Sequence, residues 1–372
     1  MEQDVRFMEM ALELARTARG QTSPNPLVGA VVVKNGQVVG MGAHLKAGEP
    51  HAEVHALRMA GEQAKGATLY VTLEPCSHHG KTPPCAEAVV ASGISRVVVA
   101  VLDPNPMVAG KGIDVLRGAG IDVRIGVREQ EAQKLNEVFF HYIQTRLPFV
   151  TVKTASTLDG KIATVTGHSR WITGEAARSE VHELRRTHDA ILVGAGTVLA
   201  DDPELTARVQ GELYGRQPVR VILDSQLRTP MNARLLQDQA APTWIITTPS
   251  APEERRLTLS HAKGVTLITL DAPLLVTDVL KRLGELGITS LLVEGGAEVN
   301  GSFLRARAIQ KIISYVSLKL VGGSQAPTPF GGTGFATMDE AVKLTDLTIE
   351  QVSEQDVRII GYPQWEQLDQ SR

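Results

Sequence analysis

The chain has 372 residues, of which 43% are hydrophobic and 21% charged, and its net charge is −3 from 38 basic and 41 acidic side chains. This length predicts two globular domains, at roughly 150 residues each. The balanced charge argues against a long nucleic acid as partner, and no run of 18 apolar residues offers a membrane span. With two cysteines and no secretion-signal pattern in the first residues, we expect a protein of the reducing cytoplasm.

The first third of the chain alternates helical and strand patterns. An amphipathic helical pattern covers residues 3–19, and Asn35-Gly36 between two β-rich runs predicts a hairpin of residues 27–33 and 37–41. The elements predicted next are a helix at 51–60, a strand at 67–73, a helix at 85–91, a strand at 96–101, a helix at 112–118 and a strand at 121–125. Such alternation predicts a sheet covered by helices on both faces.

The pattern starts again at residue 147 and predicts a second α/β domain, so the expected domains are 1–146 and 147–372. Helical patterns lie at 175–186 and 277–286. The predicted strands are 149–153, 190–193, 219–223, 243–247, 265–270, 290–293 and 312–320.

Residues 51–85 carry the pattern with the most chemical content. His51 and Glu53 open a predicted helix, Cys76 follows a strand, and Cys85 opens the next helix. One imidazole and two thiolates form a catalytic zinc site that keeps its fourth position open for water. Zinc lowers the pKa of that water from 15.7 to about 7. We therefore predict Zn²⁺ on the histidine and both cysteines, with Glu53 as the catalytic proton carrier, as in nucleobase deaminases.

Two features of this pattern leave the interpretation open. The usual deaminase spacing is Cys-x-x-Cys, whereas eight residues separate Cys76 from Cys85. Residues two apart do not share a helix face, so the spacing of His51 and Glu53 alone does not place both at one metal ion. A structural zinc site would instead need a fourth protein ligand. The candidates for that ligand are His55, His78 and His79.

Four motifs taken together are specific. They are HAEVHA (51–56), EPCSHHGKTPPC (74–85), PNPLVG (24–29) and DPNP (103–106). This set resembles the bifunctional deaminase/reductases of riboflavin biosynthesis, a family in which the two cysteines stand this far apart. The resemblance covers essentially the whole chain. It implies a cytidine-deaminase-like three-layer α/β/α fold for the first domain.

The resemblance also implies a substrate for the first domain. The expected reaction is hydrolysis of the 2-amino group of 2,5-diamino-6-(5-phosphoribosylamino)pyrimidin-4(3H)-one, with Glu53 moving protons from water to the pyrimidine ring and to the departing ammonia. The implied substrate contacts are Asn25, His44, Lys81 and Asn105. From the residues alone, both asparagines lie beside prolines and are equally well explained as turn residues.

Glycines in the second domain offer two possible phosphate loops. Gly194-Ala195-Gly196 follows a predicted strand, but the sixth position of a Rossmann fingerprint would be Leu199, so that fingerprint is not supported. Gly295-Gly296 lies between a predicted strand and helix, where backbone N–H groups can meet a phosphate. A plain strand-to-helix turn explains the same spacing.

The family resemblance continues through KTASTLDGK (153–161), WIT (171–173), GTVLADDP (196–203) and VEGG (293–296). It implies a dihydrofolate-reductase-like α/β fold that uses NADPH to reduce the ribosyl group of 5-amino-6-(5-phosphoribosylamino)uracil to ribityl, with hydride delivered to C1′. The implied NADPH contacts are Ala155, Trp171, Thr197, Asp201, Ser225, Gly296, Ala297, Glu298, Val299, Asn300, Gly301 and Ser302. The implied substrate contacts are Ser169, Arg185, Leu205, Arg208 and Glu294. The candidates for proton handling are Lys153, Asp201 and Glu294.

Some of these assignments make physical sense without the resemblance. Arg185 and Arg208 carry the planar forks suited to a 5′-phosphate, although arginines on helices are commonly solvated. Two other functions fit the residues: a deaminase of another base whose second domain only binds or dimerises, and a zinc-stabilised binding module without activity. We expect phosphorylated pyrimidines as ligands, no nucleic acid or membrane partner, and a homo-oligomer.

Overall fold

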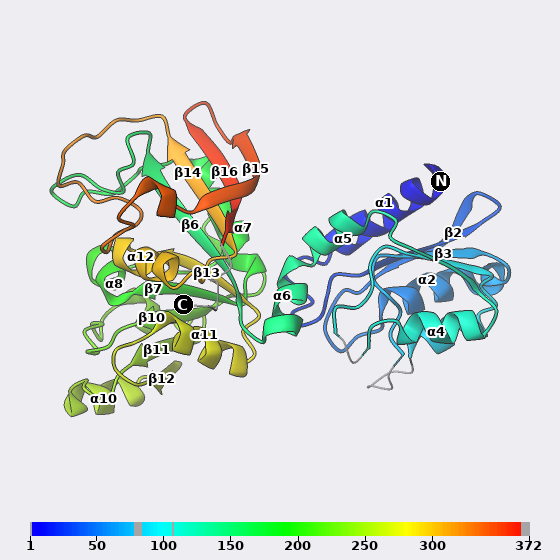
Figure 1. Ribbon diagram of the computed structural model, residues 1–372. Helices are drawn as coiled ribbons and strands as arrows, with labels where there is room; N and C mark the ends of the chain where they lie inside the picture. The colour runs from blue at the N-terminus through cyan, green and yellow to red at the C-terminus, as the bar shows by residue number, and fades with distance from the viewer. Residues whose placement is uncertain (1, 78–83, 106–107, 366–372) are drawn as a thin grey trace. The chain divides into compact units, whose positions relative to one another are not determined.

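The computed structural model describes residues 2–77, 84–105 and 108–365. The chain forms two compact units, Met1–Arg146 and Leu147–Arg372, each built around a sheet with a hydrophobic core of its own (Figure 1). None of the described helices combines the length and the apolar character that crossing a bilayer requires.

The first unit contains a five-stranded sheet in the order β2-β1-β3-β4-β5. Its elements are α1 (Glu2–Arg16), β1 (Gly29–Lys34), β2 (Gln37–Ala43), α2 (Ala52–Ala60), the 3₁₀ helix η1 (Gly61–Ala64), β3 (Thr68–Val71), α3 (Cys85–Ala91), β4 (Arg96–Val99), α4 (Lys111–Gly118), β5 (Asp122–Ile125), α5 (Glu129–Leu135) and α6 (Glu137–Thr145). Strand β1 is antiparallel to β2 and β3, and the pairs β3–β4 and β4–β5 are parallel. The predicted hairpin is confirmed, because Asn35 and Gly36 both have the positive φ that its tight turn requires.

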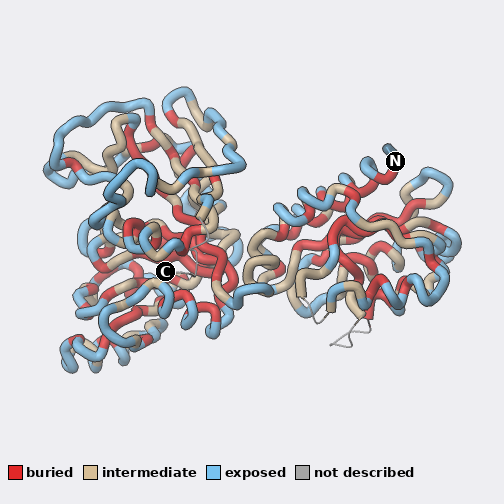
Figure 2. The backbone as a smooth tube through the Cα atoms, in the orientation of Figure 1, coloured by how far each residue is buried: buried red, intermediate tan, exposed pale blue. Residues whose placement is uncertain are grey.

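Helices cover both faces of this sheet. Helices α1 and α5 lie over one face, and α2 and α4 lie over the other (Figure 1). The central strands are buried between these layers, whereas the outer faces of the helices are exposed (Figure 2). The predicted three-layer arrangement is therefore confirmed. The sequence patterns do not predict α5 and α6, which complete the unit.

The second unit contains a nine-stranded sheet in the order β12-β11-β10-β7-β13-β6-β14-β16-β15. Its elements are β6 (Phe149–Thr157), α7 (Glu175–Thr187), β7 (Ala190–Gly194), α8 (Ala195–Asp201), β8 (Arg208–Val209), β9 (Glu212–Leu213), β10 (Val219–Leu223), α9 (Arg234–Gln237), β11 (Thr243–Thr247), α10 (Glu253–Ser260), β12 (Val265–Thr269), α11 (Val276–Glu285), β13 (Ser290–Gly295), α12 (Ala297–Arg305), β14 (Lys311–Ser317), the 3₁₀ helix η2 (Met338–Glu340), β15 (Lys343–Gln351) and β16 (Asp356–Gln364).

The strands β12, β11, β10, β7, β13, β6 and β14, which are neighbours in this order, all run parallel. Strands β16 and β15 continue the sheet as antiparallel strands. Strands β7 and β13 are almost wholly buried, as expected for parallel strands covered on both faces. The carboxyl ends of parallel strands share one edge of a sheet, which is where α/β proteins place their ligands. All seven predicted strands are present, although β14 ends at Ser317 rather than at the predicted residue 320.

Candidate active sites

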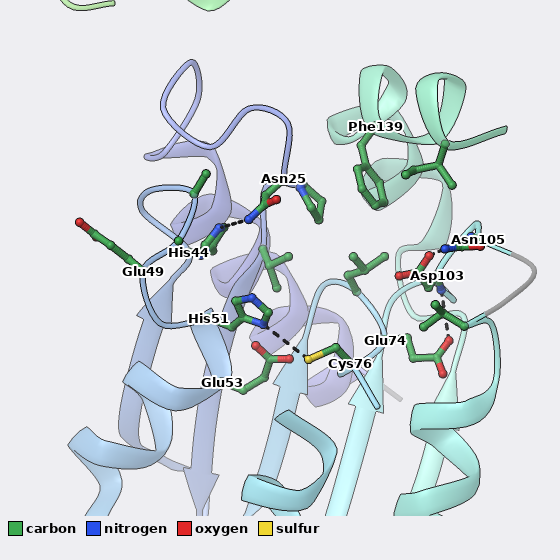
Figure 3. Close-up of a pocket in the computed structure, with 17 residues that line it drawn as sticks. Asn25, His44, Glu49, His51, Glu53, Glu74, Cys76, Asp103, Asn105 and Phe139 are labelled. Atoms are coloured by element: carbon green, nitrogen blue, oxygen red, sulfur yellow. Dashed lines mark hydrogen bonds between the residues drawn. The ribbon is translucent and has the colours of Figure 1, made fainter. Parts of the chain in front are cut away.

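The position of α2 on the sheet determines where the predicted zinc ligand and its carboxylate lie. A Cβ at Gly42 of β2 would stand 2.4 Å from the carbonyl oxygen of Ala52, so a glycine is needed for the helix to lie this close. His51 precedes α2 as its N-cap, in extended backbone with φ −75° and ψ 166°. Glu53 lies in the first helical turn. Because His51 is not part of the helix, both side chains point toward Cys76 despite their spacing (Figure 3).

Three side chains of the first unit meet in a group suited to a metal ion. The candidate ligand atoms of His51, Cys76 and Cys85 all lie within 4.8 Å of one another. His51 Nδ1 is 3.2 Å from Cys85 Sγ and 3.7 Å from Cys76 Sγ. In a tetrahedral zinc site with bonds of 2.0–2.3 Å, ligand atoms stand about 3.5–3.8 Å apart. The group therefore fits zinc with only small adjustments.

The group also favours thiolate at one of its sulfurs. Hydrogen bonds from the Cys85 thiol, from His51 and from the Cys85 backbone N–H lower the pKa of Cys76 to about 4. Thiolate is the form that binds metal. Of the candidate fourth ligands, His55 is not part of the group found among the described residues, and His78 and His79 lie outside those residues. Three protein ligands leave one tetrahedral position for a reacting group.

Glu53 has the surroundings of a proton carrier. Its side chain is buried, and burial raises its pKa to about 7. Its Oε2 atom has no hydrogen-bond partner among the described residues. A carboxyl group with a pKa near the working pH can both accept and donate a proton.

A pocket of about 480 Å³ opens above this group (Figure 3). The predicted site residues that line it are Asn25, His44, His51, Glu53, Cys76 and Asn105. His44 Nδ1 donates to the Pro50 carbonyl oxygen at 3.3 Å, and His44 Nε2 accepts from the Asn25 side-chain amide at 3.1 Å. Burial lowers the pKa of His44, which favours the neutral ring that this pattern needs. The predicted contact Lys81 lies outside the described residues.

Sequence reasoning missed one wall of this pocket. Phe139 and Ile143 of α6 line it, and Phe139 is drawn in Figure 3. Residues four apart share a helix face, so the apolar spacing within 137–145 is a signal that could have revealed this wall. Glu74 and Asp103 also line the pocket and were not among the predicted contacts.

The second unit gathers three of its predicted site residues into a buried ion-pair cluster. Arg185 of α7 donates from Nε to Glu294 Oε1 at 2.7 Å and from Nη2 to Glu294 Oε2 at 2.9 Å. Lys153 Nζ of β6 lies 3.1 Å from Glu294 Oε2. Burial raises the pKa of Glu294, but the two cations outweigh it and hold that pKa well below its usual range. Glu294 is therefore a fixed carboxylate that orients both cations.

The two predicted phosphate-binding arginines have protein partners. Besides its contacts with Glu294, Arg185 donates from Nη1 to the Thr206 carbonyl oxygen at 3.2 Å. Arg208 donates to Thr206 Oγ1 at 3.0 Å and to the Gly211 carbonyl oxygen at 2.6 Å. The two guanidinium groups therefore meet at Thr206. Leu205, the residue before it, is buried.

Predicted NADPH contacts near both ends of α8 make hydrogen bonds with other segments of the second unit. Ser169 Oγ donates to Asp201 Oδ1 at 3.4 Å, and Thr197 Oγ1 donates to the Gly295 carbonyl oxygen at 3.3 Å. Gly296, with φ 83°, is the N-cap of α12, which holds the predicted contacts 297–302.

Three predicted NADPH contacts have other surroundings in the second unit. Trp171 is 64% exposed and stacks under the Arg178 guanidinium, 4.4 Å from the ring centroid. Ala155 lies in β6, opposite Tyr315 of β14. Ser225 lines a separate hollow of about 350 Å³ to which no other predicted NADPH contact belongs.

Comparison with known proteins identifies the family. Residues 148–357 match the family model described as the RibD C-terminal domain, and residues 1–101 match the cytidine and deoxycytidylate deaminase zinc-binding region. The chain is 52% identical over 358 residues to the riboflavin biosynthesis protein RibD of Bacillus amyloliquefaciens, which covers 96% of this chain and 95% of that protein. The chain belongs to the RibD family.

RibD proteins of other bacteria match over a similar length. The Escherichia coli K12 protein is 43% identical over 96% of this chain and 97% of its own. The solved structure of Acinetobacter baumannii RibD has a TM-score of 0.87 at 41% identity, covering 98% of this chain and 99% of that one. The Thermotoga maritima diaminohydroxyphosphoribosylaminopyrimidine deaminase/5-amino-6-(5-phosphoribosylamino)uracil reductase has the same TM-score at 39% identity and the same coverage.

Membership of the RibD family confirms several predictions. The fold class is confirmed, with a cytidine-deaminase-like first domain and a RibD reductase domain after it. The protein is an enzyme of riboflavin biosynthesis, which excludes the zinc-stabilised binding module without activity. Its deaminase domain is zinc-binding and carries the group of one histidine and two cysteines.

Proposed function

We propose that the first unit hydrolyses the 2-amino group of 2,5-diamino-6-(5-phosphoribosylamino)pyrimidin-4(3H)-one, and that the second unit reduces the ribosyl group of the product with NADPH. The observation that carries the deaminase proposal is the group of His51, Cys76 and Cys85 next to the buried Glu53, at the base of a pocket of about 480 Å³. The T. maritima relative, whose name states both activities, supports both halves of the proposal.

In the deamination, the protein groups hold the substrate and move protons. When bound, Zn²⁺ supplies a nucleophile at neutral pH by lowering the pKa of water to about 7. Glu53 takes up a proton at Oε2, which has no hydrogen-bond partner among the described residues, and returns protons to the pyrimidine ring and to the departing ammonia. Asn25 and the neutral His44, which are hydrogen-bonded to each other, orient the substrate from the opposite wall.

In the reduction, the protein supplies charge and orientation. NADPH provides the hydride for C1′ of the ribosyl group. The α12 N-terminus at Gly296 offers backbone N–H groups suited to its pyrophosphate. The ionised Glu294 holds the Lys153 amino group, which is positioned to carry the proton that the sugar ring oxygen needs when the ring opens. Arg185 also pairs with Glu294 and completes the ion-pair cluster.

Two further predictions belong with this function. A cytoplasmic location suits a metal site that uses two unpaired cysteines, Cys76 and Cys85. A homo-oligomer is common among enzymes of this size. Light scattering of the purified protein measures the oligomeric state directly.

The decisive test is Glu53→Gln in an assay that follows ammonia release and NADPH oxidation separately. We expect the variant to keep zinc and fold but to release ammonia at least about 100-fold more slowly, the usual contribution of a general acid–base group. Reduction of supplied deaminated product should continue at the wild-type rate, which makes the second activity an internal control. Deamination at the wild-type rate would contradict the role of Glu53.

A further inference from the structure

One buried carboxylate beside the deaminase pocket has no role in the mechanism above. Glu74 lies in the segment that follows β3, three residues after Val71 and two residues before Cys76, and is 4% exposed. It is not among the metal-site residues. Its side chain points away from His51 and toward the loop that holds Asp103 and Asn105 (Figure 3). The carboxylate therefore acts on the pocket wall rather than on the metal.

Four backbone N–H groups donate to this carboxylate. Glu74 Oε2 accepts from Asp103 N–H at 3.2 Å and from Gly110 N–H at 3.0 Å. Glu74 Oε1 accepts from Gly112 N–H at 2.9 Å and from Ile113 N–H at 3.3 Å. Hydrogen bonds to an ionised acceptor are about twice as strong as neutral ones. Both ends of the segment 103–113 are thus tied to one side chain.

The same segment also touches the backbone that leads to Cys76. A Cβ at Gly112 would stand 2.0 Å from the Pro75 carbonyl oxygen, so the first turn of α4 lies directly on that peptide. At the other end, Asp103 Oδ1 accepts from the Asn105 N–H at 2.8 Å. Asp103, Asn105 and Val108 all line the pocket. A continuous chain of contacts therefore links a candidate zinc ligand to the facing wall.

We propose that Glu74 is a positioning residue for deamination, which holds the pocket wall of residues 103–105 and 108–113 at a fixed distance from Cys76. The inference rests on the proposed deaminase function of this pocket. Glu74 is not part of the candidate metal group, and its carboxylate is bonded to the backbone of Asp103, so it acts through Asp103 and Asn105. A wall displaced by about 1 Å can lower kcat/KM about 100-fold, because it no longer holds the substrate in place against the reacting groups.

The test is Glu74→Gln, measured by steady-state ammonia release and normalised to bound zinc. Glutamine keeps the size of the side chain, but its NH₂ group faces backbone N–H donors and leaves two of them without an acceptor. We expect KM for the diaminopyrimidine to rise at least tenfold with a smaller loss in kcat. Zinc per chain and NADPH oxidation with supplied deaminated product should stay at wild-type values. Glu62→Gln, which makes the same chemical change on an exposed residue of η1, is the matched control and should change nothing.

A second variant reaches the wall from the other side. Gly112→Ala keeps the Glu74 carboxylate but forces α4 away from the Pro75 carbonyl oxygen and crowds Glu74 Oε1, so it should show the same rise in KM. A purely structural role predicts a different result, namely less folded, zinc-loaded protein with a wild-type KM in the remaining active fraction. That result in either variant overturns the proposal. If the wild-type protein itself releases no ammonia from this substrate, the proposed function fails and the inference falls with it.

Discussion

The ion-pair cluster around Glu294 yields a stability prediction whose size follows from the structure. Glu294→Gln keeps the side-chain volume but removes the negative charge between Lys153 and Arg185. Those cations are only 13% and 17% exposed. Removing one partner of a buried ion pair costs roughly 3–5 kcal/mol, because an uncompensated charge stays buried. The glutamine oxygen still accepts from Arg185, so we expect the lower end, about 3 kcal/mol.

The pH dependence of this difference follows from the lowered pKa of Glu294. The ordinary pKa of the carboxyl group is 4.5, and the folded value lies well below it. A lowered folded pKa means that the stabilisation is fully present above the unfolded pKa and is lost as the pH falls toward the folded one. Below 4.5, the advantage of wild type over Glu294→Gln should therefore shrink by up to about 1.4 kcal/mol per pH unit. Near neutral pH it should be constant.

Tryptophan fluorescence measures the stability difference between wild type and Glu294→Gln within the second unit of the chain. The three tryptophans, Trp171, Trp244 and Trp365, all belong to the second unit, so urea titration followed by their emission reports that unit alone. A loss of about 3 kcal/mol should lower the melting temperature by about 6–12 °C for a domain of this size. Glu285→Gln, which removes an exposed pair with Arg282, is the control and should cost under about 1 kcal/mol. The reasoning is refuted if Glu294→Gln loses as little free energy of unfolding as the control does. It is also refuted if the loss in acid is as large as the loss near neutral pH.

Three further predictions concern the first unit. A chelator should stop ammonia release, and added zinc should restore it. Reduction of supplied deaminated product should continue, because the metal-site residues lie within the first unit. Loss of both activities would argue against this. Gly42→Ala should lower the zinc content and the deaminase rate together, because its Cβ would collide with the Ala52 carbonyl oxygen. A zinc content of the variant equal to that of wild type, measured by metal analysis, would contradict this. Asp4→Asn should cost about 2 kcal/mol, because Asp4 accepts hydrogen bonds from Arg96 and Arg124. Hydrogen bonds from Arg96 are the main cause that lowers the pKa of Asp4 to about 2, so this stabilisation is present above pH 4 or so and is lost in stronger acid, as circular dichroism can measure.

The fold was predictable wherever burial dictates the pattern. Strands β10 and β11 begin and end where the sequence predicts, because both are rich in the β-branched and aromatic residues that favour strands. The hairpin of β15 and β16 escaped prediction for the opposite reason. Most residues of β15 are exposed, so its sequence carries no period-two pattern of apolar residues. Tertiary pairing with β14 and β16, rather than local sequence, places these strands in the sheet.

The metal site shows how a sound local rule can mislead. Residues two apart do not share a helix face, which counted against His51 and Glu53 acting together. The rule does not apply here, because His51 is the extended N-cap and only Glu53 is helical. Predicted helix ends are uncertain by one or two residues, and one residue decides this case. Sequence spacing thus named the chemical groups that the fold brings together but could not supply their directions.

Three buried glutamates mark the limit of what residue type reveals. Burial by itself raises the pKa of a carboxyl group, as it does for Glu53, whose Oε2 has no partner in the described part of the chain and suits proton transfer. Two cations reverse that effect at Glu294 and keep it an anion at neutral pH. At Glu74, four backbone N–H groups surround the carboxylate and make it a fixed link between distant segments. The partners of Glu74 lie 29 to 39 residues away from it in the sequence, and Arg185 lies 109 residues away from Glu294. Only the folded chain therefore distinguishes the three roles.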